Sequence, residues 1–401
     1  MSRIKRRYLA WAALGLLTGA LAVAAAGCGG GSSSSSKSSN STTTVGPASI
    51  GKGEGALNLI EWPYYSDPSF AKKFTQQTGC VIQRKDAGSS NEMVALMRAG
   101  GGGGGGGQWD LVSASGDASL RLIRGGDVKP VNIKLIPSWN DFIPIFKSPA
   151  HNTVNGVHYG VSLQWGPNVL LYNKTKVKPG PTSWAALYDP KYKGQITIPN
   201  NPIQIADAAF YLMHSQPDLG IKDPYELNKK QFDATIALLK KQRKLVKLYW
   251  NYDTDGRAAF ANGDVSLGAI WPADTAALQQ KGVPVKEVIP SVGATGWADT
   301  WMLAKKAPHP NCAYLWMKYV TTPKPEAQQA LIFRETPVNP KACPIMDKME
   351  AGSCAKFHLN EPLPYYNTIK FWKTPIPQCG NGKNDCMDYN AWQTAWTQVT
   401  G

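Results

Sequence analysis

Aromatic side chains and carboxylates recur where segments predicted to be β-strands end. The faces of aromatic rings attract ammonium groups, and a nearby carboxylate neutralises such a cation through a charge-assisted hydrogen bond. This combination suits the binding of a small organic cation. The residues concerned are Trp62 and Tyr65 after the strand 56–62, Trp271 after the strand 265–270, and Trp297 and Asp299 in the segment 293–300.

A third predicted strand, 109–114, is followed by Ser115 and Asp117. Ligands of open α/β sheets lie just beyond the carboxyl ends of the strands, so side chains that follow several strands are candidates for one site. The alternative is that each tryptophan packs in the core and that Asp117 caps a helix. Repetition after three strands is harder to explain by packing than any single case.

Enzyme and metal motifs are weak. The chain has no HExxH or G-x-S-x-G motif, and its five histidines have no motif-like neighbours. Asp117 and Asp299 would act on a glycosidic bond only if held roughly 5–9 Å apart. The segment 251–256 resembles the start of a calcium loop, but Asn262 occupies the twelfth position, where glutamate is required. The glycines of 100–107 lack the lysine of a phosphate-binding loop. We therefore expect no catalysis, metal or cofactor.

The N-terminus predicts export. Basic residues precede an uncharged stretch from residue 8 to 26, which ends in small residues before Cys28. This is a secretory signal over 1–27, and the cysteine resembles the lipid-modified residue of a lipoprotein. The segment 28–55, rich in Gly, Ser and Thr, is predicted to be a disordered tether. An uncleaved membrane anchor is the alternative. Either places the body outside the cytoplasm, on the outer face of the cytoplasmic membrane.

Charge and cysteine content fit an exported protein. The net charge is +15, from 43 basic and 28 acidic residues, but the basic residues are dispersed, which favours a solvated surface over a nucleic-acid site. Six cysteines remain after Cys28, an even number that favours disulfides. Short loops suggest two pairs and leave a long-range third, namely Cys343–Cys354, Cys379–Cys386 and Cys80–Cys312.

The body alternates predicted strands and helices with short connections, which is typical of an α/β fold with largely parallel sheets. Four segments resemble the polyamine-binding proteins of ABC importers, the spermidine/putrescine-binding family. They read YGVSLQWGPNVLLYN, SW…L.DPKYKGQI, GDVSLGAIW and GATGWADTW. The resemblance implies a type II periplasmic-binding-protein fold, in which two α/β lobes joined by crossing strands close over a ligand. It places lobe 1 at 56–165 and 299–345, and lobe 2 at 166–298 and 346–401.

The resemblance also implies a site, a monomer and a partner, the membrane-spanning permease. Trp62, Tyr65, Trp271 and Trp297 match the family's aromatic box, and Asp299 matches the carboxylate that meets an amine. Two positions depart from the pattern, because Asn201 and Gln204 stand where the family has an acidic patch. Asp117 is a candidate to restore that charge. Asp274 is a further candidate, for which capping of the following helix is the better interpretation.

Three alternatives stay open. The same class of receptor could bind another solute, such as an amino-acid derivative, a neutral sugar-like molecule or a phosphonate, because two family carboxylates are amides here. An exported hydrolase would need the paired carboxylates described above. A basic adhesin for cell-wall polymer would use the positive surface.

Overall fold

The computed structural model describes residues 46–102 and 107–401. The predicted signal, Cys28 and most of the predicted tether lie outside these residues. The last part of that tether, 46–55, contacts the body: Glu54 accepts hydrogen bonds from the backbone N–H groups of Asn311 and Cys312, each at 2.8 Å. Within the described residues, every helix is too short or too polar to cross a bilayer.

The first sheet has seven strands in the order β13-β6-β12-β3-β1-β2, with β14 paired to β12. β1, β2 and β3 are parallel, whereas β12 runs antiparallel to both β3 and β6. Helices α1 and α8 pack together on this sheet, as do α2 and α3. The strands are β1 (Ala56–Glu61), β2 (Val81–Asp86), β3 (Leu111–Ser115), β6 (Gly160–Pro167), β12 (Ala294–Leu303), β13 (Thr336–Pro337) and β14 (Ile369–Phe371), and the helices are α1 (Pro68–Thr78), α2 (Ser90–Met97), α3 (Gly116–Gly125) and α8 (Pro310–Val320).

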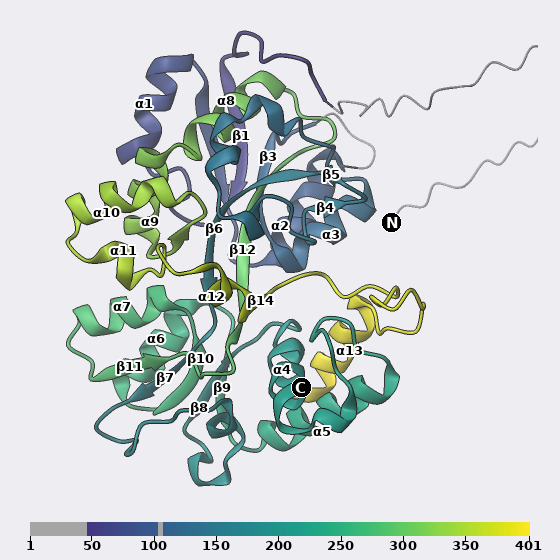
Figure 1. Ribbon diagram of the computed structural model, residues 1–401, viewed down its shortest axis with the longest axis vertical. Helices are drawn as coiled ribbons and strands as arrows, with labels where there is room; N and C mark the ends of the chain where they lie inside the picture. Colours follow the sequence, from purple (N-terminus) through teal and green to yellow (C-terminus); the bar gives the residue numbers. More distant parts are fainter. Residues whose placement is uncertain (1–45, 103–106) are drawn as a thin grey trace, which may run out of the picture. The chain divides into compact units, whose positions relative to one another are not determined.

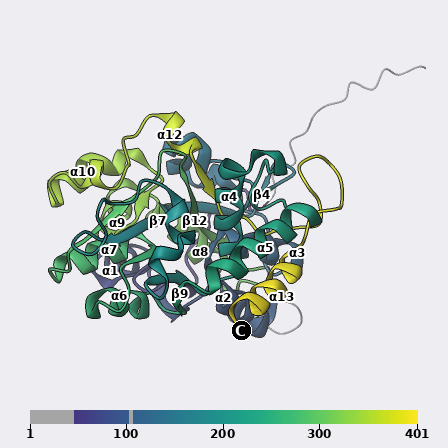
Figure 2. The same ribbon diagram turned by 90° about the horizontal axis from the view of Figure 1, so that it is seen from below.

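The second sheet has five strands in the order β11-β7-β10-β8-β9. Figures 1 and 2 place α4, α5 and α13 on one side of it and α6 and α7 on the other. Its strands are β7 (Val169–Asn173), β8 (Ile196–Pro199), β9 (Val246–Trp250), β10 (Leu267–Ile270) and β11 (Val285–Val288), and its helices are α4 (Gln204–Ser215), α5 (Lys229–Arg243), α6 (Asp253–Asn262), α7 (Pro272–Gln280) and α13 (Tyr389–Thr400).

The two sheets form the two lobes of a type II periplasmic-binding-protein fold, and the chain crosses between them. β6 leads directly into β7 of the other sheet, and β12 returns from β11. The changes of lobe expected at residues 165/166 and 298/299 therefore fall inside β6 and β12. A small hairpin, β4 (Thr153–Val154) with β5 (Val157–His158), precedes β6.

The C-terminal part contacts both lobes. Within 346–401, which the sequence assigned to the second lobe, α11 packs on α10 and β14 pairs with β12, whereas α13 packs on α5. Helix α10 in turn packs on α9, next to the first sheet. The helices of this region are α9 (Pro323–Phe333), α10 (Cys343–Met349), α11 (Ser353–Lys356) and α12 (Leu363–Asn367).

Local sequence explains where several elements begin. Asp67 caps α1 by accepting a hydrogen bond from the N–H of Ser69, and Pro68 occupies the first helical position, as its missing N–H group favours. Asp274 accepts a weak hydrogen bond from the backbone N–H of Trp271 at the start of α7, 3.4 Å away, and pairs with Arg257 at 2.7 Å. The interpretation of Asp274 as a helix cap is confirmed.

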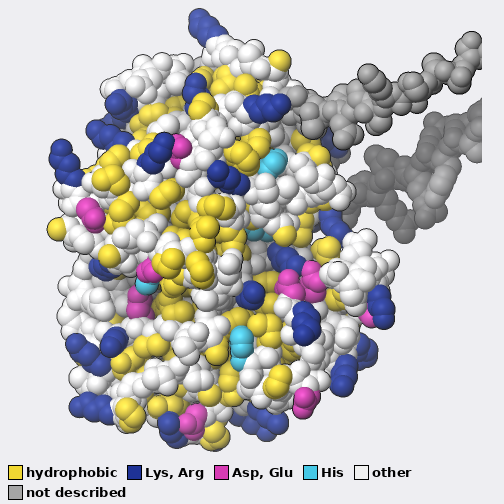
Figure 3. All heavy atoms as spheres, viewed as in Figure 1, with side chains coloured by type: hydrophobic (Ala, Val, Ile, Leu, Met, Phe, Trp, Pro, Cys, Tyr) yellow, Lys and Arg dark blue, Asp and Glu magenta, His cyan; other side chains and the backbone are white. Residues whose placement is uncertain are grey.

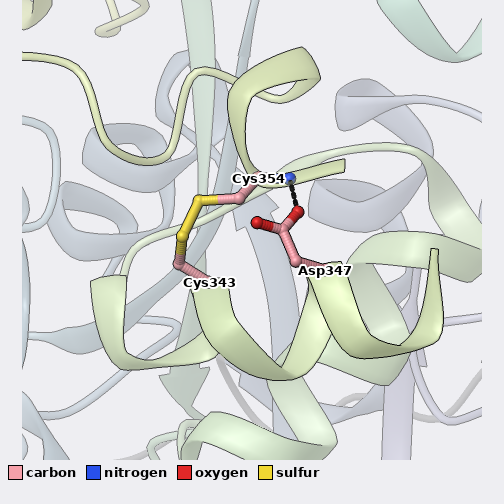
Figure 4. Close-up of side chains that lie close together, drawn as sticks. All are labelled: Cys343, Asp347 and Cys354. Atoms are coloured by element: carbon pink, nitrogen blue, oxygen red, sulfur yellow. Dashed lines mark hydrogen bonds between the residues drawn. A yellow bond between two sulfur atoms is a disulfide. The ribbon is translucent and has the colours of Figure 1, made fainter. Parts of the chain in front are cut away.

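The structure contains the three disulfides that loop lengths suggest: Cys80–Cys312, Cys343–Cys354 and Cys379–Cys386. Figure 4 shows Asp347 beside the second of them, where its carboxylate accepts a hydrogen bond from the N–H of Cys354 at 2.8 Å. Both sulfur atoms of this cluster are committed to the disulfide, so they cannot serve as thiolate ligands while it is intact.

Removal of the Cys80–Cys312 disulfide is expected to cost more stability than removal of Cys379–Cys386. Cross-linking restricts the unfolded chain more when the closed loop is longer, and the two separations are 232 and 7 residues. Loop entropy gives about 5 kcal/mol for the first and about 2 kcal/mol for the second as upper values. Urea unfolding of the two double Cys→Ser variants tests this. Equal losses would contradict it.

Candidate functional site

Strand β12 carries one face of the candidate site. Thr295, Trp297 and Asp299 are alternate residues of this fully buried strand, and alternate side chains of a strand point to the same face. Trp297 lies against Gly166 of β6, where an added Cβ would come within 2.3 Å of the indole. Glycine is therefore required for the ring to lie across β6. Pairing with β6 is irregular between Ala298 and Thr300, a feature common next to sites.

The carboxylate of Asp299 accepts hydrogen bonds from two hydroxyl groups. The hydroxyl of Ser115, at the end of β3, contacts one carboxylate oxygen, and the phenol of Tyr65 contacts the other. Tyr65 is held in the turn after β1, where its N–H donates to the carbonyl of Trp62 at 3.2 Å. β1 and β3 are parallel, so their carboxyl ends bring Tyr65 and Ser115 to the same edge of the sheet. These three predicted residues lie together.

A further carboxylate, Glu335, joins this group and was not predicted from the sequence. The phenol oxygen of Tyr65 lies 2.6 Å from its Oε2. Glu335 follows α9 directly after Arg334, which adopts the left-handed conformation at φ 67°. Arg334 is held by an ion pair with Glu350 at 2.6 Å, so the backbone that presents Glu335 is fixed by α10.

Burial dominates the electrostatics of this group. It raises the pKa of Asp299 to about 7, a rise to which nearby Asp117 adds and which the hydrogen bonds from Ser115 and Tyr65 oppose. Burial, and then the charge of Asp299, hold the pKa of Glu335 well above its usual range. Carboxylates in this position favour either a proton or a bound cation.

A second polar group surrounds Asp207, in the first turn of α4. The Thr295 hydroxyl donates to Asp207, and the side-chain amide of Asn168 donates to both Asp207 and Thr295. Trp271 joins through its indole N–H, which donates to Asn168 Oδ1 at 3.2 Å. Burial raises the pKa of Asp207 to about 7. Asp207 was not predicted from the sequence, although it is the only acidic residue in the apolar run IQIADAAF.

The other predicted residues are placed as follows. Asp117 lies in the first turn of α3 and accepts a hydrogen bond from Ser90 at 2.8 Å; burial raises its pKa, and this hydrogen bond and the charge of Arg121 oppose the rise. Asn201 lies before α4, where its Oδ1 accepts a hydrogen bond from the N–H of Ile203 at 3.0 Å. Gln204 is buried at the start of α4, and its Nε2 has no partner among the described residues. Trp62 and Trp271 are half-buried at the ends of β1 and β10, and Trp271 packs edge-on against Trp250.

Two cavities of the structure lie elsewhere. One, of about 660 Å³, is formed by the segment 176–192. Another, of about 420 Å³, lies beside β14 and is lined by residues that include His151, Tyr225 and Phe371. Neither is lined by a predicted site residue. The candidate site is thus a set of packed, mostly buried side chains along β12.

The charge of the candidate site is opposite to that of the surface. Figure 3 shows lysine and arginine side chains scattered over this face of the described body. In contrast, within residues 46–102 and 107–401, four carboxylates of the site have no lysine, arginine or histidine nitrogen within 4.0 Å. They are Asp117, Asp207, Asp299 and Glu335. Buried unpaired carboxylates are costly, and a cationic ligand would compensate them.

Comparison with known proteins identifies related chains. The family model described as bacterial extracellular solute-binding protein matches residues 69–352. The spermidine/putrescine-binding periplasmic protein of Escherichia coli (strain K12) is 23% identical over 275 residues, which cover 68% of this chain and 75% of that protein. The fold is similar to the spermidine/putrescine ABC transporter substrate-binding protein PotD from Streptococcus pneumoniae, with a TM-score of 0.68, 17% identity and coverage of 86% and 97% of the two chains. It is also similar to the PBP MotA from A. tumefaciens B6 in complex with glucopine, with a TM-score of 0.65, 16% identity and coverage of 86% and 100%.

Proposed function

Because the chain belongs to the bacterial extracellular solute-binding proteins, which serve ABC importers and are not enzymes, we propose that it captures a polyamine between its lobes. One observation carries this proposal: the same face of β12 has carboxylates at both ends and an indole between them. Asp299 and Glu335 lie at one end, and Asp207 lies beside Thr295 at the other. A ligand with two cationic groups joined by methylenes matches this order.

The spacing favours an elongated ligand. Thr295 and Asp299 are four residues apart on an extended strand, which places their Cα atoms roughly 13 Å apart. Trp297 lies midway and covers apolar chain with its ring, whose face also attracts ammonium groups. Tyr65, Trp62 and Trp271 complete the aromatic surroundings. Because most of these residues are buried, entry of the ligand requires the lobes to separate at the crossing strands.

We further propose that the receptor is attached to the cytoplasmic membrane and delivers its ligand to a permease there. A signal over 1–27, lipid on Cys28 and the Gly/Ser/Thr-rich segment that follows it would keep the receptor at the outer face of the cytoplasmic membrane. The lobes, once closed on the amine, would then dock to the permease as a monomer. The relatives named as spermidine/putrescine-binding proteins support this role.

A second candidate ligand is a zwitterionic amino-acid derivative. Among the buried donors of the described residues that have no hydrogen-bond acceptor, three belong to predicted site residues: the indole N–H groups of Trp62 and Trp297 and the side-chain amide of Gln204. A ligand that carries oxygen atoms as well as an amine would satisfy them. The similar fold solved with glucopine supports this candidate.

Isothermal titration of the full-length chain with putrescine, spermidine, agmatine, γ-aminobutyrate and glucopine separates the two candidates. We expect saturable binding of at least one of the first three amines, together with a rise in melting temperature, since a ligand at 100 times its Kd stabilises the fold by about 2.7 kcal/mol. Binding of glucopine or γ-aminobutyrate without any response to the polyamines would overturn the polyamine proposal in favour of the second.

A further inference from the structure

The phenol of Tyr65 lies between two carboxylates, and its geometry constrains their protons. Its oxygen is within hydrogen-bond distance of Oδ2 of Asp299 and of Oε2 of Glu335. A phenol has a single proton to donate. If both carboxyl groups were ionised, one of the two contacts would set oxygen lone pairs against each other. Both contacts are satisfied when the phenol donates to one carboxylate and the other carboxyl group is protonated and donates to the phenol.

The surroundings favour this single extra proton. The groups nearest to the two carboxylates are neutral or acidic: Ser115 from β3, Asp117 from α3 and Gln164 from β6. α3 also carries Arg121, whose charge acts on Asp117. With its amide oriented to satisfy both neighbours, Gln164 donates to Oε2 of Glu335 and accepts from the N–H of Ala330, each at 3.0 Å. The rings of Trp301 and Phe333 pack on Tyr65. No lysine, arginine or histidine of the described chain pairs with either carboxylate.

Glu335 is also held in place from outside the site. Arg334, directly before it, adopts the left-handed conformation and pairs with Glu350 at the end of α10. The Cys343–Cys354 disulfide ties the start of α10 to α11 (Figure 4). The second carboxylate is thus part of a built arrangement and not the end of a mobile loop.

We infer that Asp299 and Glu335 share one proton through Tyr65 in the ligand-free protein and lose it when a cationic amine binds, so that ligand capture releases a proton. This inference rests on the proposed function and adds Glu335 as a residue that sets specificity for cations. The step is balanced: one carboxyl O–H bond breaks, the proton passes to solvent buffer, and the ammonium group replaces its positive charge.

The expected pH dependence follows from this exchange. The ligand binds the form in which both carboxyl groups are ionised, so its affinity rises with pH while the free protein keeps the shared proton. For a one-proton exchange the rise is about tenfold per pH unit. The rise ends once the free pair has lost its proton, and it reverses only where the amine itself loses its charge, near pH 10 for an alkylamine.

Calorimetry on the native chain tests the inference without any variant. Titration of putrescine at pH 7 in phosphate and in Tris, whose ionisation enthalpies differ, gives the number of protons released per ligand. We expect a value between about 0.5 and 1 and a Kd that falls as the pH rises from 6 to 8. Binding with no proton release and a flat Kd would overturn the inference while leaving the proposed function intact. Absence of binding by putrescine, spermidine and agmatine would overturn both.

The variant Glu335→Gln locates the proton. Glutamine keeps the shape and can accept from Tyr65, but it removes the second titrating group of the pair, so proton release and the pH slope should fall below those of the native chain; the release that remains would come from Asp207 and Asp299, whose pKa values are raised to about 7. The matched control is Glu326→Gln, at another buried carboxylate of this region, which among the described residues accepts only from the backbone N–H groups of Val338 and Asn339. That variant should release protons like the native chain. Unchanged release in folded Glu335→Gln would show that the proton belongs elsewhere and overturn the inference.

Discussion

The Asp299→Asn variant is expected to bind putrescine about 30-fold or more weakly than the native chain, without loss of stability in the ligand-free state. Truncation of one partner of a buried charge pair costs about 2–5 kcal/mol of binding free energy, and 2 kcal/mol already corresponds to about 30-fold. The native carboxyl group is buried, and burial raises its pKa to about 7. At pH 8 the folded protein therefore carries an unpaired buried charge that asparagine removes.

Weaker binding of putrescine without a loss of stability distinguishes a binding residue from a structural one. A carboxylate that holds the fold together would lower the melting temperature when it is replaced. We therefore expect calorimetric titration to show weaker binding while thermal unfolding at pH 8 shows a melting temperature equal to or above that of the native chain. Loss of stability together with unchanged affinity would assign Asp299 to the scaffold and contradict its place in the site.

Asp110→Asn is the matched control. Asp110 is also fully buried, but it lies before β3, at the end of that strand opposite Ser115. It accepts hydrogen bonds from the backbone N–H groups of Asn58 at 2.7 Å and His309 at 2.6 Å. Its replacement is expected to lower stability, because two partly buried donors lose a charged acceptor, and to leave the affinity for putrescine unchanged.

Part of the site could be predicted from sequence because its residues follow strands. Trp62, Ser115 and Trp271 come directly at strand ends, and the chain order of strands and helices fixes which edge those ends share. Trp297 and Asp299 differ, since they lie inside β12 and not after a strand. The sequence marks them only through the glycine and tryptophan residues around them, whereas the structure shows a crossing strand whose alternate residues face the site.

Asp207 and Glu335 could not be identified by the same reasoning. Glu335 meets Tyr65 across 270 residues of sequence, and the left-handed Arg334 that turns it inward has no signature comparable to a glycine. Asp207 lies one helical turn after Gln204, so a search confined to the start of α4 finds only amides. An isolated carboxylate among alanine, isoleucine and phenylalanine residues was the available signal, because such a helix face is buried.

The ligand-free protein is expected to lose about 2–4 kcal/mol of unfolding free energy between pH 6.5 and pH 8.5. Burial is the first cause in raising the pKa of Asp207, Asp274 and Asp299 to about 7 and that of Glu61 to about 8. In the unfolded chain these groups ionise near pH 4. Above pH 6.5 the unfolded state has already lost these protons, so a further rise in pH deprotonates only the folded state.

A carboxyl group whose pKa is raised in the folded state stabilises the fold while it carries its proton. Its contribution to the free energy of unfolding is complete below the pKa of the unfolded chain and is lost as the pH rises through the pKa of the folded state. His151 acts in a different range. Burial lowers its pKa to about 4, so its contribution is complete above its unfolded pKa of about 6.5 and is lost only as the pH falls toward 4. The interval from 6.5 to 8.5 therefore isolates the carboxyl groups.

A saturating polyamine should reduce this loss, because its ammonium groups compensate the carboxylates that ionise at the site while Glu61 and Asp274 are unaffected. Urea unfolding at pH 6.5, 7.5 and 8.5 measures how the free energy of unfolding changes with pH, with and without putrescine. The Asp207→Asn/Asp299→Asn double variant provides the comparison, since its slope without ligand should be shallower and should not respond to putrescine. Stability that rises with pH in the ligand-free native chain would mean that these carboxyl groups are already ionised in the fold, and the electrostatic reason for attracting a cation to β12 would then be lost.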